Sequence, residues 1–174
     1  MIKNYNIFVE TLVTELMENR LKTEYKVNKY GYLVDGRVKD RFELIFETYS
    51  GFEYKIDFLP YSIKACTINL GTNYAYNISF SGSENSIFGN VEEYNNPTKR
   101  NEEIEVFSRV LYILDDFKID HNVFVVGETR YDIKNKIYNY IINKCFPNYI
   151  KFKNICLKLG NGKTTTFLVK KEKD

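Results

Sequence analysis

The sequence predicts an α+β fold, in which an antiparallel meander sheet of about five to seven strands packs against an N-terminal helix and two later helices. Apolar and polar residues alternate from Arg41 to Ser81, which is the pattern of strands with one buried and one solvated face. Turn sequences at Ser50-Gly51, Pro60 and Gly71-Thr72-Asn73 interrupt this alternation. Breaks this short are typical of hairpins rather than helical crossovers.

The N-terminal part is expected to hold one helix and then strands. Asn4 can cap a helix that runs to about Arg20, because the apolar residues of this segment recur at spacings of three and four. One or two short strands are expected between Leu21 and Val34. Asp35-Gly36 then gives a strong signal for a tight hairpin turn.

The meander is expected to bury one face of each strand. The Ser50-Gly51 turn joins two strands whose inward residues are Phe42, Leu44, Phe46, Phe52, Tyr54, Ile56 and Phe58. Pro60 is expected to end this hairpin. A weaker strand is expected from Ser62 to Leu70 and a strong one from Tyr74 to Ser81. The strong strand carries Tyr74, Tyr76, Ile78 and Phe80 on one face and the small residues Ala75, Asn77, Ser79 and Ser81 on the other.

The C-terminal half is expected to alternate helices and strands within the same single domain, which spans residues 1–174. A polar loop at 82–100 precedes a helix that begins at Asn101, with an expected buried stripe of Ile104, Phe107, Val110, Leu111 and Leu114. A short strand from Asn122 to Val126 and a helix from Thr129 to about Cys145 follow. The last element is a hairpin of Tyr149 to Leu159 and Thr164 to Val169, and the charged tail 170–174 is expected to fray.

The amino-acid composition indicates the source and cellular location of the protein more clearly than its function. Lys outnumbers Arg by 19 to 6, and Ala occurs only twice, a bias typical of a low-GC genome such as that of many bacteria, their phages and some viruses. The three cysteines, Cys66, Cys145 and Cys156, are too far apart for a zinc or redox motif, so we expect reduced thiols. No segment resembles a signal peptide or a membrane span. We therefore expect a cytoplasmic protein, bacterial or in an infected host cell, with no cofactor, no metal and no membrane partner.

The long loop is the first candidate functional element, since long irregular loops in compact domains are usually functional or disordered. It carries the apolar residues Ile87, Phe88, Val91 and Tyr94 amid polar ones, and it leaves the meander at the strand that holds Asn77 and Ser79. These six residues are predicted to bind another protein; the alternative is that the four loop residues pin the loop to its own domain. The leading hypothesis is a non-enzymatic inhibitor or immunity-type protein of a phage or mobile element, which occupies a partner's surface.

Nucleic-acid binding is the alternative function. Residues 121–174 carry 11 Lys and Arg against 4 Asp and Glu. Arg130, Lys134, Lys136, Lys151 and Lys153 lie in this segment with tyrosines between them, so phosphate contacts and base stacking could occur together. A solvated lysine-rich surface would have the same composition.

Three motifs resemble catalytic ones. Asp40, Glu53 and Lys55 could form a metal-dependent nuclease site, which is a further alternative. Gly160-Asn161-Gly162-Lys163-Thr164 ends like a phosphate-binding loop, but a strand rather than a helix is expected after it. The single histidine, His121, excludes any site that needs two. These residues assemble no convincing catalytic set, so we expect no enzymatic activity.

Overall fold

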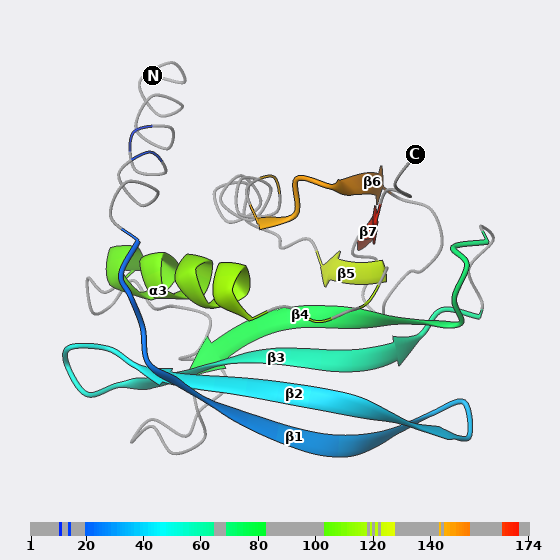
Figure 1. Ribbon diagram of the computed structural model, residues 1–174, viewed down its shortest axis with the longest axis horizontal. Helices are drawn as coiled ribbons and strands as arrows, with labels where there is room; N and C mark the ends of the chain where they lie inside the picture. Colours follow the sequence, from blue (N-terminus) through cyan, green and yellow to red (C-terminus); the bar gives the residue numbers. More distant parts are fainter. Residues whose placement is uncertain are drawn as a thin grey trace.

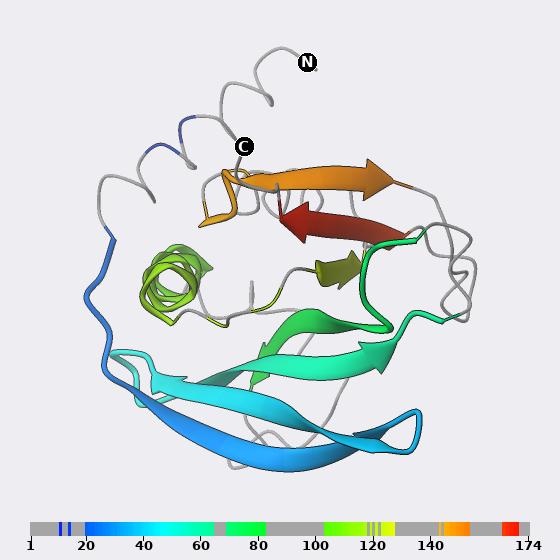
Figure 2. The same cartoon turned by 45° about the vertical axis from the view of Figure 1, so that its right-hand side comes forward.

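The computed structural model describes residues 11, 14, 20–64, 69–82, 103–117, 119, 121, 123–127, 143, 145–153 and 165–170. These residues form a mixed seven-stranded sheet in the order β1-β2-β3-β4-β5-β7-β6 and one complete helix, α3. The sheet is curved, and α3 lies against its concave side (Figures 1 and 2). The predicted α+β class, with an antiparallel meander beside a helix, is therefore confirmed for the described part of the chain.

The meander consists of β1 (Tyr25–Val34), β2 (Arg37–Glu47), β3 (Glu53–Ser62) and β4 (Tyr74–Gly82), and each strand pairs antiparallel with the next. Asp35 and Gly36 have φ values of 52° and 76°, as a two-residue type I′ turn requires. Gly51 has a φ of 81°, and its N–H donates to the Thr48 carbonyl at 3.0 Å. Both turn predictions are confirmed, and β1 is one long strand rather than two.

The meander is followed by α3 (Glu103–Asp116) and then by β5 (Val123–Gly127), which pairs with β4 in parallel. Parallel neighbours need a crossover connection, and α3 lies in the connection between β4 and β5. The β4–β5 pair therefore departs from the expected antiparallel order. β7 (Thr165–Lys170) pairs antiparallel with both β5 and β6 (Tyr149–Lys153). Residues 154–164 lie outside the described part, so the connection expected for the final hairpin stays a prediction.

Other expected elements also fall on residues that the structure does not describe. Of the N-terminal helix only Thr11, Thr14 and Arg20 are described, and of the helix ending at Cys145 only Asn143 and Cys145. Cys145 is buried, as expected, while Cys66 and Cys156 are outside the described residues. The tail 171–174 is outside them too.

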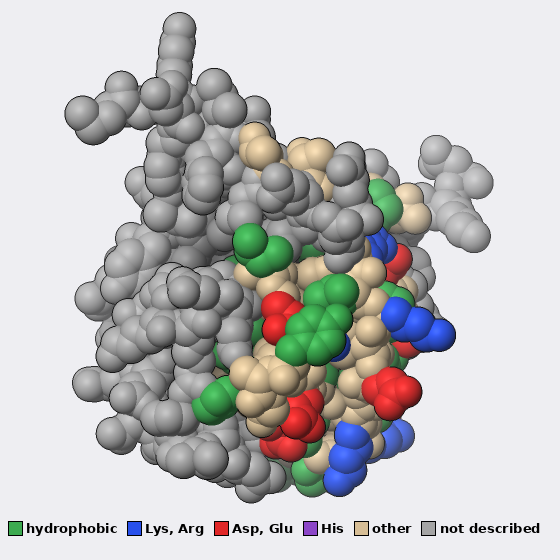
Figure 3. Space-filling model, turned by 90° about the vertical axis from the view of Figure 1, so that its left-hand side faces the viewer, with side chains coloured by type: hydrophobic (Ala, Val, Ile, Leu, Met, Phe, Trp, Pro, Cys, Tyr) green, Lys and Arg blue, Asp and Glu red, His purple; other side chains and the backbone are tan. Residues whose placement is uncertain are grey.

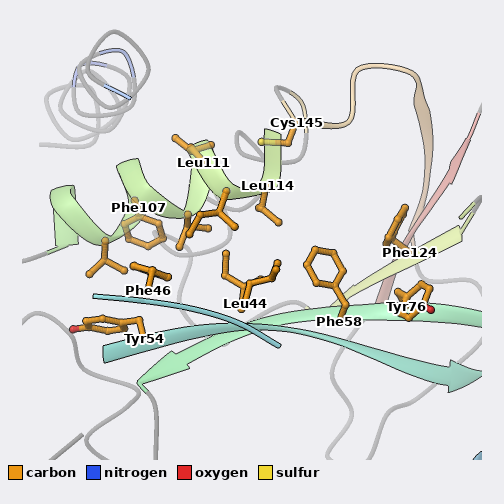
Figure 4. Packing of buried hydrophobic residues seen from close by; sticks show 14 residues of the cluster. Leu44, Phe46, Tyr54, Phe58, Tyr76, Phe107, Leu111, Leu114, Phe124 and Cys145 are labelled. Carbon is orange, nitrogen blue, oxygen red and sulfur yellow. The ribbon is translucent and has the colours of Figure 1, made fainter. Parts of the chain in front are cut away.

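The core lies between the meander and α3. Leu44 and Ile56 have no exposed surface, and Phe46 and Phe58 are 2% exposed. The side chains of Leu44, Phe46 and Phe58 point from the sheet towards α3 (Figure 4), and Ile56 belongs to the same cluster as Phe107, Leu111 and Leu114. The predicted inward face of the second and third strands is thus confirmed from Leu44 to Phe58, with Phe42 and Phe52 half-buried at its margin.

The expected stripe on α3 is wrong at one position and too narrow. Ile104 is 53% exposed, whereas Val106, Ile113 and Arg109 are buried. Val106 and Ile113 belong to the core cluster. Ser108 and Arg109 are buried because a second segment packs on α3: the Leu21 N–H donates to Ser108 Oγ at 3.0 Å, and Thr23 Oγ1 accepts a hydrogen bond from Arg109. A helix covered on two sides buries more than one stripe.

Pro60 does not end its strand, because only one of the two ladders stops there. The β2–β3 ladder ends at the pair Phe42–Phe58, but the β3–β4 ladder continues through Pro60 to Ser62. The Thr48 N–H bonds to the Phe52 carbonyl, so even-numbered residues of β3 direct their backbone groups towards β2. The N–H that proline lacks would have reached the Asp40 carbonyl, and the Tyr76 hydroxyl donates to that carbonyl instead, at 2.8 Å.

The strand expected from Ser62 to Leu70 is wrong in its bounds. Ser62 is the last residue of β3, while Ile63, Lys64, Asn69 and Leu70 are outside any strand, and 65–68 are not described. The Ile63 N–H bonds to the Asn73 carbonyl at 3.0 Å, which closes the connection between β3 and β4. The described ends of this segment are therefore tied together outside any strand.

Tyr76→Phe is expected to lower the free energy of unfolding at neutral pH by about 1–2 kcal/mol, because the Asp40 carbonyl loses its donor. Burial, with smaller contributions from Tyr74 and Asp40, raises the pKa of Tyr76 to about 12. The unfolded-state pKa of tyrosine is about 10, so this stabilisation is complete below pH ~10 and is lost as the pH rises through ~12. Urea unfolding from neutral to alkaline pH would measure both effects. Tyr32→Phe, at an exposed tyrosine of β1, should change neither.

Candidate functional site

An ion cluster occupies the face of the meander opposite α3. Arg41 donates to both carboxylate oxygens of Asp57, at 3.1 and 2.7 Å, and to Glu43 at 2.8 Å. Lys55 Nζ lies 3.4 Å from the same Glu43 oxygen. Hydrogen bonding to Asp57 is the main cause that raises the pKa of Arg41. Two cations and two anions balance one another here, so this group is best suited to holding β2 and β3 together.

The predicted nuclease triad is not assembled. Glu53 and Lys55 lie on the face of the ion cluster, because Lys55 reaches Glu43. Asp40 lies on the opposite face, where it forms an ion pair with Lys29 at 3.0 Å beside the ring of Phe42. Among the described residues there is no group of three His, Cys, Asp or Glu side chains arranged to hold a metal ion. The geometry therefore gives the nuclease alternative no support.

His121 takes part in packing. Its Nε2 lies 3.1 Å from the Tyr74 carbonyl oxygen, and its ring lies 4.4 Å from that of Tyr74 and 5.1 Å from that of Tyr76, centroid to centroid. Its own carbonyl accepts a hydrogen bond from the Tyr149 hydroxyl at 3.0 Å. These contacts agree with a structural role for the only histidine.

The residues predicted to bind a partner are only partly described. Ile87, Phe88, Val91 and Tyr94 lie outside the described residues, with the rest of the expected loop after Gly82. On β4, Asn77 is half-buried and Ser79 is exposed, whereas Ala75 on the same face is fully buried. The small-residue face is thus already covered at Ala75 and open only towards Ser79.

The basic residues proposed for nucleic-acid binding are also split. Arg130, Lys134 and Lys136 lie outside the described residues. Lys151 and Lys153 are both on β6. Whether the five cations form one surface stays a prediction.

The structure instead draws attention to the β1–β2 hairpin, which the sequence reasoning did not select. Its exposed apolar side chains are Leu33 (68%), Val38 (71%), Tyr30 (46%), Val27 (44%) and Tyr32 (40%). Leu33 and Val38 face each other across the ladder next to the turn. The signal in the sequence was the run from Tyr30 to Val34, where apolar residues stop alternating and occupy both faces of the strand.

The opposite end of the meander differs in character. There, apolar side chains lie singly among Lys, Arg, Asp and Glu side chains (Figure 3). Tyr49, which is 79% exposed, lies at the β2–β3 turn with its ring 4.6 Å from the Arg109 guanidinium, and its backbone N–H donates to Glu105. A tyrosine held in this way is part of the local structure, whereas Leu33 and Val38 are 68% and 71% exposed on paired strands next to the β1–β2 turn.

Comparison with known proteins adds no family: no protein-family model, no curated protein and no solved structure matches the chain. Among the described residues, no helix is long and apolar enough to cross a membrane. The case for a function therefore depends on the geometry of the described residues.

Proposed function

We propose that this protein is a non-enzymatic binding protein of the inhibitor or immunity type, which acts by pairing β1 with an extended, acidic and apolar segment of another protein. The observation that carries the proposal is the open edge of the sheet. β1 is first in the strand order and ten residues long, and no described strand pairs with it on its outer side. Pairing of a partner strand at such an edge is a common mode of peptide recognition.

The edge lacks most of the features that usually protect edge strands. Edge strands are usually protected by being short or by containing proline, bulges or free charges. The β1–β2 register runs without a bulge from Tyr25–Phe46 to Val34–Arg37, and β1 contains no proline. Of its two lysines, Lys29 is already paired with Asp40. An extended segment could therefore align along most of β1.

The direction of the backbone groups in β1 follows from its neighbours. Even-numbered residues of β2 face β3, so its odd-numbered residues face β1. Each of these pairs with an even-numbered residue of β1, as in the closing pair Val34–Arg37. The N–H and C=O groups of Val27, Lys29, Gly31 and Leu33 consequently point outwards, where a partner strand could bind them.

Charge favours a different protein over a second copy of this chain as the occupant. The exposed Lys26 and Arg37 have no ion pair with a described residue, so the hairpin presents uncompensated positive charge beside its apolar side chains. Two copies pairing through β1 would bring these cations together, and like charges across strands are destabilising. An acidic segment with apolar residues at alternate positions would complement the edge.

Affinity capture with matched variants tests the proposal. The immobilised protein is incubated with lysate of its source cells, and retained proteins are quantified by mass spectrometry. We expect a retained protein to fall at least about tenfold with Leu33→Lys/Val38→Lys, because apolar contacts at the tip are lost. Val27→Pro, which removes one outward donor and leaves the β1–β2 ladder intact, should also reduce it.

Ile150→Lys is the control, since it adds a positive charge at the opposite edge of the sheet, on a residue that is 45% exposed. Equal retention by all variants would contradict the proposal. A concentration-dependent dimer of the pure protein that Val27→Pro abolishes would show instead that a second copy occupies β1. The loop residues Ile87, Phe88, Val91 and Tyr94 can be tested in the same experiment as an extension of the surface.

A further inference from the structure

A second feature lies at the turn end of the same hairpin, where the β1–β2 turn faces the β3–β4 connection. A pocket of about 370 Å³ opens between them. It is lined by Val34, Asp35, Arg37, Lys39, Lys64, Thr72, Asn73 and Tyr74. The volume is within the range of small-molecule sites, and at roughly 30 Å³ per water it is too large for one small ion.

The charge of this pocket is unbalanced. Arg37, Lys39 and Lys64 give three positive charges, and Asp35 gives one negative charge, so the lining carries a net +2. Asp35 is already occupied: its carboxylate accepts a hydrogen bond from the Ser62 hydroxyl at 2.7 Å and lies 3.5 Å from Lys64 Nζ. Arg37 has no ion pair with any described residue. The free positive charge is therefore that of Arg37 and Lys39.

Lys39 is held in place by an aromatic ring. Its Nζ lies 4.5 Å from the centroid of Tyr74, and the Tyr74 backbone is fixed by His121 and by Thr72, whose hydroxyl donates to the Tyr74 carbonyl at 3.1 Å. A cation–π contact positions an ammonium group without neutralising its charge. The cation thus remains available to a ligand in a defined place.

We infer that this pocket is a binding site for a small phosphorylated molecule, whose phosphate is held by Arg37 and Lys39. Arginine offers a planar fork that binds phosphate oxygens in a bidentate manner, and lysine adds a compact charge. A phosphate monoester carries nearly two negative charges at neutral pH, which matches the net charge of the lining. The space beyond the phosphate leaves room for an organic group beside Asn73 and Val34.

The inference does not require the proposed partner protein: the two proposals share the charge of Arg37, but phosphate binding is measured on the pure protein with small molecules and involves neither the outer backbone of β1 nor Leu33 and Val38. Calorimetric titration of the full chain with adenosine monophosphate, pyrophosphate and adenosine tests it. We expect saturable binding of one adenosine monophosphate or pyrophosphate per chain and none of adenosine. Arg37→Gln should raise the Kd about tenfold or more, and Lys39→Gln should raise it by a smaller factor.

Lys26→Gln is the matched control, since it removes one exposed positive charge from the same hairpin, outside the pocket. It should change the Kd by less than about twofold, because solvent-exposed charges at a distance are screened. An equal loss with Lys26→Gln would show a non-specific charge effect and overturn the inference. Absence of binding by both phosphorylated probes at millimolar concentration would overturn it as well. Unchanged circular dichroism and thermal unfolding of Arg37→Gln would show that any lost affinity is not lost folding.

Discussion

Leu44→Ala is expected to lower the free energy of unfolding by about 3–5 kcal/mol, the range found when a fully buried leucine is truncated in a rigid core. Leu44 has no exposed surface, and it lies in the layer between β2 and α3 with Ile56 and Leu111 (Figure 4). Its neighbours belong to a paired sheet and a helix that is covered on two sides. They have little freedom to fill the space, so the cavity cost adds to the lost burial.

Leu33→Ala is the matched control, because it is the same substitution on the neighbouring strand at a residue that is 68% exposed. It should change the stability by no more than about 0.5 kcal/mol. Urea unfolding of both variants, followed by circular dichroism, would measure the difference. Equal effects would mean that α3 does not pack on the meander as described.

Arg41→Met is expected to lower the free energy of unfolding by about 2–3 kcal/mol. The carboxylates of Asp57 and Glu43 are only 15% and 14% exposed, and both would lose their main donor. Removing one partner of a fully buried ion pair costs about 3–5 kcal/mol, and partial exposure of this cluster reduces the figure. The apolar stem of Met replaces most of the packing of the Arg stem, so the loss reports mainly on charge and hydrogen bonding.

A double-mutant cycle separates this effect from general disruption. Asp57→Asn alone and with Arg41→Met should reveal a coupling of about 1–2 kcal/mol, since the pair is hydrogen-bonded twice. Lys29→Met breaks an exposed pair, with side chains 60% and 50% exposed, and should cost less than about 1 kcal/mol. A coupling near zero would show that the cluster contributes nothing to the stability of the meander.

Short-range sequence signals were sufficient to predict the β1–β2 and β2–β3 hairpins. Asp35-Gly36 and Ser50-Gly51 place glycine where a positive φ is needed, and the alternation of Leu44, Phe46, Ile56 and Phe58 fixes which face is buried. Pro60 was misread, because a proline blocks one ladder only and the sequence does not show which neighbour a backbone N–H faces. The burial of Arg109 is hidden from the sequence for a similar reason: helical spacing predicts one buried stripe, but the segment that covers Ser108 and Arg109 comes from residues 21–23.

The candidate sites depended still more on contacts between distant residues. Asp40 and Glu53 are close in sequence terms and lie on opposite faces of the sheet, which the β2–β3 register decides. The pocket at the hairpin tip joins Arg37 and Lys39 to Lys64 and Tyr74, and no linear motif connects them. The open edge of β1 is visible only once the strand order is known.

By itself, the sequence determined the secondary structure of the meander, its buried face and its turns, because period, turn chemistry and hydrophobicity act over a few neighbouring residues. The tertiary structure decided the strand order, the parallel pairing of β4 with β5, and which charges are balanced by ion pairs. These features arise from contacts between residues far apart in the chain, where register and packing set the outcome. The surfaces proposed here to bind a partner strand and a phosphate are of this second kind.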